Sequence, residues 1–357
     1  MLAFKYVSYH FLKYFFIILF ALVLFSVGFE YTSKASNSLD SANLLLIYLV
    51  YKSFFAVDML LPISLIFAMI STKIFLIRSN ALVSFYSLGY SRVQILKPFV
   101  VVSVIITIVF ILLHLSSSFS RASEHADNIE DNSEYLSPTR DLFFSYKEKF
   151  VYFSKMQPLQ SRAYDVRVFS AINGSLKEVV VASSAIYKDD FWHIKNANII
   201  TKPDDMSFKS LGIKVTKTND LQLLEGFKPK ILDQVYEGKV NFTIGDAVEA
   251  IFILKDENVN LDTIKGALYK MIIYPFFAPS LVVIIFFFVP ISARFLNVSL
   301  FSFGAIIATL MIWGIMFVLS ELAKNKTIPA EIGIIAPVLI LFFIAFGLWR
   351  KYTLKTG

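Results

Sequence analysis

Six apolar segments constrain the fold of this chain most strongly, because each is long enough to cross a lipid bilayer as a helix. The chain has 357 residues and 56% of them are hydrophobic, a fraction above that of ordinary soluble proteins. We therefore predict an α-helical membrane protein with six transmembrane helices. The predicted spans are Tyr14–Phe29, Asp58–Ile77, Phe99–Leu115, Leu268–Ile291, Phe301–Leu322 and Ile328–Trp349.

The limits of the first two spans allow alternatives. Tyr14–Phe29 follows a basic amino-terminal piece and also fits a cleaved signal peptide, although no small-x-small cleavage pattern follows and further spans come after it. The run before the second span is too long for one simple crossing, so we interpret Leu44–Ala56 as an amphipathic or tilted lead-in near the outer surface. Pro62 is expected in the first turn of the second span or at a kink. Three prolines predict kinking of the fourth span.

The charged residues are distributed unevenly, and this predicts the orientation of the chain. Of the 27 acidic residues, 22 lie between Glu124 and Asp262. By contrast, segments 1–29, 78–97, 291–299 and 349–357 contain Lys or Arg and no Asp or Glu. Cytoplasmic loops carry such a basic excess, so we predict that these segments and both termini are cytoplasmic. The net charge of +7 is therefore a topology signal and not the footprint of a nucleic-acid partner.

The polar stretch between the third and fourth spans predicts an inserted all-β domain. Its short apolar runs alternate, and turn residues such as Asn173-Gly174, Asp189-Asp190 and Asn219-Asp220 separate them. We expect an antiparallel sheet with one buried face, in a sandwich, a jelly roll or an open barrel. The expected domains are 1–121, 122–262 outside the membrane and 263–357, with a helical return at Phe242–Glu257. The predicted strands are Phe150–Phe153, Asp165–Phe169, Val179–Ile186, Phe191–Ile200 and Phe208–Val215.

A short basic segment, Arg78–Arg92, joins the second and third spans. Written as a helix, it separates an apolar face from a polar face. A helix across the cytoplasmic mouth of a bundle suits a membrane subunit that a soluble partner pushes, but a loop lying on the lipid surface fits as well. The apolar face holds Leu82, Phe85, Tyr86, Gly89 and Val93, and the polar face holds Asn80, Ser84, Ser87 and Ser91.

The sequence gives no sign of an active site. Cysteine is absent, the four histidines lack ligand spacing, and neither a P-loop motif nor GxSxG or HExxH is present. We therefore predict no catalytic residues, no metal and no cofactor.

Ionisable residues within or beside the apolar segments are the remaining candidates for a site. Such groups are costly at membrane depth and face a bundle interior or reach the interface. For Lys73 and Lys270 we favour snorkelling to the headgroups. Lys34 and Lys52 are predicted near the outer leaflet, where a polyanionic lipid would find charge-assisted partners. The proposed lipid-binding residues are Lys34, Lys52, Asp58 and Glu321.

The plan of three spans, a β domain and three spans resembles the LptF/LptG lipopolysaccharide-export permeases. The segment Leu88-Gly89-Tyr90-Ser91-Arg92 followed by Lys97-Pro98 resembles the family's turn after the second span. The ending Ile328-Pro329 through Pro337 to Arg350-Lys351 resembles its last span and basic tail. One departure is Ala81, where similar proteins carry a Glu, which puts that contact to the ATPase in doubt. The ending, the strand with Trp192 and the position of Lys34 are closer to the LptG type than to the LptF type.

The resemblance implies a function and a set of partners. Two such permeases would line a cavity for lipopolysaccharide, mainly with spans one, two and five, in the bacterial inner membrane. An LptB-like ATPase dimer would press on the coupling residues Arg78, Asn80, Leu82, Phe85, Tyr86, Gly89 and Arg92. The lipid would then pass to a bridge of periplasmic β-jellyroll domains, with LptC-like and LptA-like neighbours. The alternatives are an LptF-type paralogue, a membrane-anchored periplasmic sensor or scaffold, and an enzyme acting on a lipid-linked substrate.

Overall fold

The computed structural model describes most of the chain and divides it into two compact units. We call Met1–Glu130, Phe242–Gly245 and Lys265–Gly357 the helical unit, and Asp131–Asn241 with Asp246–Ile264 the sheet unit. The described residues are 2–34, 42–130, 139–146, 149–157, 161–172, 175–203, 212–226, 229, 242–254, 261–289, 297–325 and 327–354.

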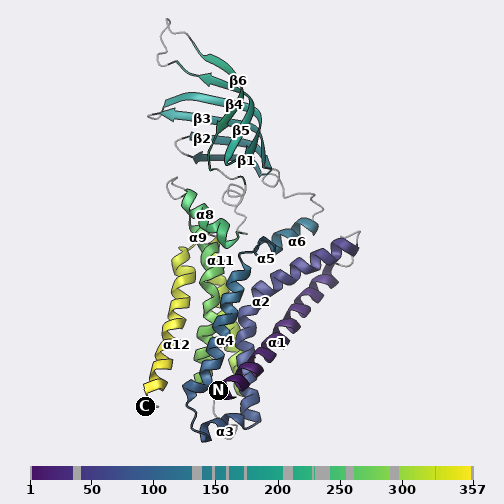
Figure 1. The fold of residues 1–357 in the computed structure, drawn as a ribbon, viewed down its shortest axis with the longest axis vertical. Coiled ribbons are helices and arrows are strands. Elements are labelled where there is room, and N and C mark those ends of the chain that lie inside the picture. Colours follow the sequence, from purple (N-terminus) through teal and green to yellow (C-terminus); the bar gives the residue numbers. More distant parts are fainter. Residues whose placement is uncertain are drawn as a thin grey trace. The chain divides into compact units, whose positions relative to one another are not determined.

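Within the described residues, six helices are long and apolar enough to cross a membrane, as predicted (Figure 1). Three of them precede the strands in the chain and three follow. In chain order, the helical elements before the strands are α1 (Leu2–Lys34), α2 (Ala42–Arg78), α3 (Ala81–Ser87), α4 (Arg92–Leu113), α5 (Ser117–Ser120) and α6 (Ala122–Glu130). After the strands come α8 (Ile244–Leu254), α9 (Asp262–Ile272), a 3-10 turn (Tyr274–Phe276), α10 (Phe277–Phe288), α11 (Val298–Lys324), a π-helical turn (Glu331–Ile335) and α12 (Ala336–Leu354).

The second span is one continuous helix of 37 residues, so the separate lead-in predicted for Leu44–Ala56 is wrong. A proline inside a helix removes one backbone donor, and its ring clashes with the carbonyl of the preceding turn, so other contacts must compensate where the helix continues. Pro62 lies inside α2, and its neighbours Leu61 and Ile63 are buried. Packing therefore holds α2 together through the proline.

The predicted kinking of the fourth span is confirmed at Pro275. This proline lies in the 3-10 turn Tyr274–Phe276, which separates α9 from α10. Pro279 lies in the first turn of α10, where the missing N–H costs no helical hydrogen bond. The fourth span is thus two helices joined by a tight turn.

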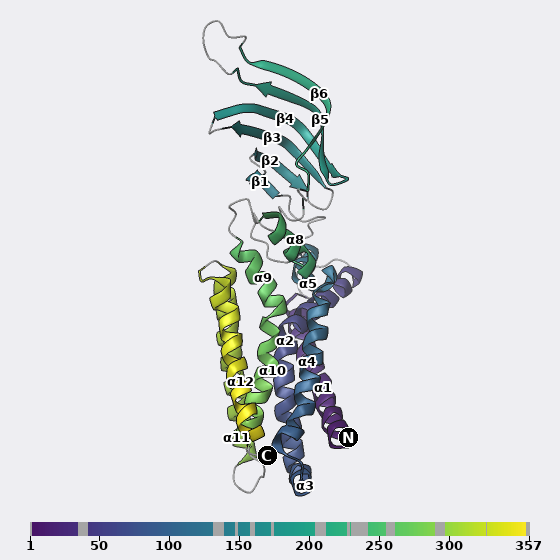
Figure 2. The same cartoon turned by 60° about the vertical axis from the view of Figure 1, so that its left-hand side comes forward.

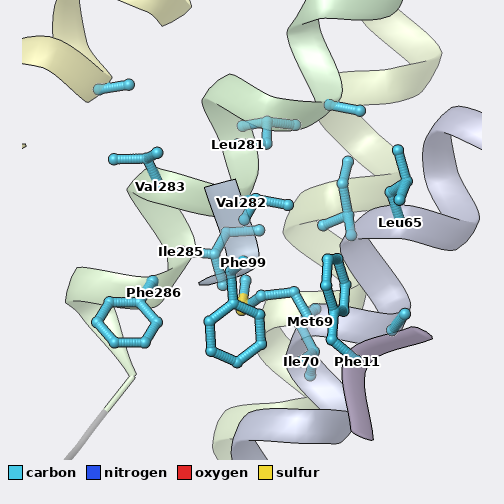
Figure 3. Close-up of a cluster of buried hydrophobic side chains, with 14 of the residues drawn as sticks. Phe11, Leu65, Met69, Ile70, Phe99, Leu281, Val282, Val283, Ile285 and Phe286 are labelled. Carbon is cyan, nitrogen blue, oxygen red and sulfur yellow. The ribbon is translucent and has the colours of Figure 1, made fainter. Parts of the chain in front are cut away.

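The core of the helical unit is built around α2 and α10. α2 contacts α1 and α10, and α10 also contacts α4 and α12. Figure 3 shows the side chains of Phe11, Met69, Phe99 and Phe286 gathered in this core. The ring centroids of Phe11 and Phe99 are 5.2 Å apart, and those of Phe99 and Phe286 are 5.7 Å apart. Aromatic and aliphatic residues from four spans therefore make one apolar centre.

The sheet unit contains one antiparallel sheet whose strands follow chain order (Figure 2). The two-residue turn Asp189-Asp190 between β4 and β5 is confirmed, because both residues have positive φ and Lys188 pairs with Phe191. The strands are β1 (Thr139–Tyr146), β2 (Lys149–Gln157), β3 (Arg162–Ile172), β4 (Ser175–Lys188), β5 (Phe191–Thr201) and β6 (Lys214–Leu223).

Two predictions for the sheet unit differ from the structure, and one strand was not predicted. The turn predicted at Asn219-Asp220 is wrong, since both residues lie in β6 and Asp220 pairs with Lys195 of β5. The strand predicted at Phe208–Val215 begins only at Lys214, and residues 204–211 lie outside the described part. β1 was not predicted. Its exposed aromatic Phe143 lies between buried Leu142 and Phe144, which hides the alternation of polar and apolar residues.

The sheet buries one face, as predicted. Trp192, near the start of β5, is fully buried on this face, with its ring 4.9 Å from Phe153 and 5.6 Å from Tyr187 between centroids. A jelly roll consists of two sheets with long crossovers. The described strands form a single open sheet of neighbouring hairpins, in which β1 and β6 are the edges.

Candidate functional site

The segment between α2 and α4 folds into a short helix, α3, with a sharp turn at each end. Asn80 precedes the helix with a φ of 57°, and Gly89 follows it with a φ of 86°. The Gly89 N–H donates to the Tyr86 carbonyl, and the Tyr90 N–H donates to the Phe85 carbonyl. These two bonds form a Schellman motif, which ends a helix at a left-handed glycine. The predicted helix is therefore confirmed only for Ala81–Ser87, and the prediction that Gly89 lies on its apolar face is wrong.

The predicted separation of an apolar and a polar face holds within α3. Leu82 is fully buried, and Phe85 and Tyr86 pack against the core of the helical unit. Burial raises the pKa of Tyr86 to about 12, and the opposing effect of the Arg92 charge is smaller. The phenol therefore stays neutral. Ser84 and Ser87 are exposed. α3 thus presents Val83, Ser84 and Ser87 outward on an anchored apolar base.

The residues on either side of α3 lie in or next to α2 and α4, and one of them contacts α12. The Ser91 hydroxyl and the Gln94 side chain form a capping box at the start of α4. The Arg92 guanidinium lies 5.5 Å from the ring centroid of Tyr352 in α12. Arg78 ends α2, and Asn80 precedes α3 without a side-chain cap bond. Figures 1 and 2 show α3 at the same end of the bundle as the start of α1 and the end of α12.

Lys52, a predicted lipid contact, already has anionic neighbours. Its Nζ lies 3.5 Å from Glu30 Oε1 and 3.5 Å from Asp127 Oδ1, and it is mostly buried. The Tyr48 hydroxyl donates to the same Glu30 oxygen at 2.6 Å. Lys52 therefore joins α1, α2 and α6. Lys34 is the last residue of α1, and its side chain lies outside the described part.

Asp58, the third predicted lipid contact, is hydrogen-bonded to His114. His114 Nε2 lies 2.9 Å from Asp58 Oδ1, and Nδ1 lies 3.0 Å from the Phe110 carbonyl oxygen. His114 follows the last residue of α4, so this contact connects α2 to the end of α4. Sequence spacing gave no sign of this pairing, because the partners lie on different spans.

Glu321, the fourth predicted lipid contact, forms an ion pair with Lys270. The Lys270 Nζ lies 2.9 Å from Glu321 Oε1, and the Lys324 Nζ lies 4.0 Å from Oε2. Glu321 therefore connects α11 to α9 through Lys270.

The snorkelling predicted for Lys73 is wrong, and for Lys270 it stays a prediction. Lys270 bonds to Glu321, and its side chain is 37% exposed. Lys73 is 2% exposed and donates to the carbonyls of Phe286 and Val289. Both lysines therefore connect helices, and the sequence pattern did not reveal their partners.

Apolar surface remains uncovered on α1 and α11. Phe20 and Phe25 of α1 are 65% and 76% exposed, and Met311 of α11 is 64% exposed. A cavity of about 360 Å³ lies between α10 and α11, with Gly304, Ala308 and other small or apolar residues along its wall. Such faces are stable only against lipid or other membrane helices. Among the described residues, no group of His, Asp and Glu could hold a metal ion.

Comparison with known proteins identifies a family over nearly the whole chain. The model of the lipopolysaccharide export system permease LptF/LptG matches residues 5–351. Comparison with curated proteins gives no match.

Proposed function

Because the chain belongs to the LptF/LptG family of lipopolysaccharide export system permeases, we propose that it is the transmembrane permease subunit of an ABC transporter that extracts lipopolysaccharide from the inner membrane. The chain is a multi-pass membrane protein. The family to which it belongs consists of permease subunits of an export system and not of enzymes. The match over residues 5–351 is the observation that carries the proposal.

The driving force in this proposal comes from a separate cytoplasmic ATPase, an LptB-like dimer. The outer surface of α3 supports this role, because Val83, Ser84 and Ser87 are exposed while Leu82 anchors the helix. Arg78 and Arg92 flank α3 and give its surroundings a positive charge. A soluble protein could press on this surface without having to enter the bilayer.

The lipid path in this proposal runs along α1, α2 and α11. The uncovered apolar faces of α1 and α11 suit acyl chains and a second, paralogous permease. Lys34, Lys52, Asp58 and Glu321 remain the proposed lipid contacts. Lys52 is paired with Glu30 and Asp127, so a lipid phosphate would compete with these two carboxylates for it.

The sheet unit in this proposal is periplasmic and hands the lipid to LptC-like and LptA-like β domains. One buried apolar face and two open edges, β1 and β6, support such a role for a jellyroll-like module. We propose the LptG type over the LptF type, and both termini in the cytoplasm.

The ATPase partner provides the direct test. From native membranes, the solubilised chain is expected to copurify with an ATPase, and the complex to hydrolyse ATP faster when lipopolysaccharide is added. Arg92→Glu is expected to lower the recovered ATPase about tenfold or more, since like charges at an interface cost several kcal/mol. The recovered ATPase activity per mole of chain is the measurement.

A matched charge reversal on the sheet unit serves as the control. Arg167→Glu changes an exposed arginine and should leave the ATPase recovery at the parental value. A parental chain that never yields an ATPase would favour the sensor or scaffold. Equal recovery with Arg92→Glu would remove Arg92 from the contact.

The proposed orientation can be tested with single cysteines, because the chain has none of its own. Ser84→Cys on α3 and Thr216→Cys on β6 both change exposed residues. In intact spheroplasts, a membrane-impermeant maleimide is expected to label Thr216→Cys fully and Ser84→Cys only after lysis. Labelling of both variants from the same side would contradict the exporter topology.

A further inference from the structure

A buried lysine of α2 holds the end of α10. Lys73 is 2% exposed, and its Nζ donates to the carbonyls of Phe286 and Val289, the latter at 3.2 Å. The Nζ also lies 3.8 Å from the centroid of the Phe286 ring. A buried amino group is costly unless its donors are used, and here two carbonyls accept from it.

The end of α10 depends on this contact. The last carbonyls of a helix lack intrahelical donors and carry partial negative charge. α10 ends at Phe288, and Val289 has an extended backbone. Without Lys73, two carbonyls would lose their donor in a buried part of the molecule, which favours local unwinding of α10.

A second connection joins the same end of α10 to the other side of α3. Arg92, the first residue of α4, lies over the ring of Tyr352, and that ring stacks on Phe287 with centroids 4.4 Å apart. Lys73 lies little more than one helical turn before Arg78, where α2 ends. Both helices that flank α3 are thus attached to the last turn of α10.

We propose that Lys73 is a positioning residue that makes α3 and the carboxyl end of α10 move as one body. In the proposed transporter, a push on α3 then shifts α10 and, through it, the second group of three spans. This inference rests on the proposed function and adds the route by which the motion crosses from the first spans to the later ones.

The measurement is the amount of lipopolysaccharide released per ATP hydrolysed by the reconstituted complex. Lys73→Met keeps the length of the side chain and removes its hydrogen-bond donors. It is expected to reduce the lipid released per ATP about tenfold, because leaving buried carbonyls without a donor shifts an equilibrium by about that factor. Basal ATP hydrolysis should stay within about twofold, since the residue touches no nucleotide.

Thr72→Val is the matched control, because Thr72 is also buried and its hydroxyl bonds only to Ala68 in its own helix. This variant should release lipid at the parental ratio. A parental ratio for an assembled Lys73→Met complex would overturn the inference. A parental complex without lipid-dependent ATP hydrolysis would instead contradict the proposed function.

A distance measurement tests the inference without changing Lys73. Spin labels at Ser84→Cys and Phe288→Cys, both exposed positions, report the separation of α3 and α10. In a complex with cysteine-free partners, this separation should change by less than about 2 Å when ATP binds, as for elements of one rigid body. A larger change would overturn the inference, and it would do so even if Lys73→Met failed to assemble.

Discussion

Trp192→Ala is expected to destabilise the sheet unit by about 3–5 kcal/mol, the usual cost of removing a fully buried large aromatic side chain. The Trp192 side chain is 0% exposed and lies between Phe153 and Tyr187. Its loss leaves a cavity in the only buried face of the described sheet. In the full-length chain, limited proteolysis should cleave the β strands far faster in the variant than in the parent.

Phe143→Ala is the matched control for this prediction. Phe143 is an aromatic residue of the same sheet but is 55% exposed on the opposite face, stacked on Phe150. Its removal is expected to change the cleavage rate only slightly. If both variants were cleaved at the parental rate, Trp192 would not hold the sheet together.

Gly333→Ala is expected to lower the stability of the helical unit by about 1–3 kcal/mol or more, because the site is already filled. A Cβ at this position would lie 2.7 Å from Ala323 Cβ and 2.9 Å from the Leu319 carbonyl oxygen in α11. Both neighbours belong to the backbone or lie beside it, so they cannot rotate away. The measurement is the midpoint of thermal unfolding in detergent, followed by intrinsic fluorescence.

Gly314→Ala is the control on α11. Among the described residues, and apart from the backbone of its own helix and its two chain neighbours, no atom lies within 4 Å of a Cβ built at Gly314. Alanine also favours a helix more than glycine does. The midpoint should therefore stay the same or rise. A Gly333→Ala variant that unfolds at the parental temperature would show that the π-helical turn does not pack closely against α11.

Hydrophobic length and charge distribution predicted the six spans, since both are local properties of the chain. The hairpin at Asp189-Asp190 and the buried face of the sheet also follow from local patterns. The contacts between residues of distant segments do not follow from such local patterns. Nothing in the spacing of Asp58 and His114, or of Lys73 and Phe286, announces a contact, because the angles at which helices pack decide it.

The length of α3 shows the same limit. The helical spacing of apolar and polar residues extended the predicted helix to Arg92. The observed helix ends at Ser87, because Gly89 adopts a left-handed conformation. The signal was present in the sequence as a glycine after an apolar run. By contrast, the contact of Lys73 with α10 could be seen only in the structure. A lysine near an interface and a lysine that caps another helix look alike in sequence.

The two tight turns beside α3 set its mechanical character. Ser79 and Asn80 alone separate it from α2, and residues 88–91 separate it from α4. Linkers this short hold no slack that could straighten under load. In the proposed transporter, a force on α3 is therefore expected to tilt α2 and α4 as whole helices and not to stretch the linkers.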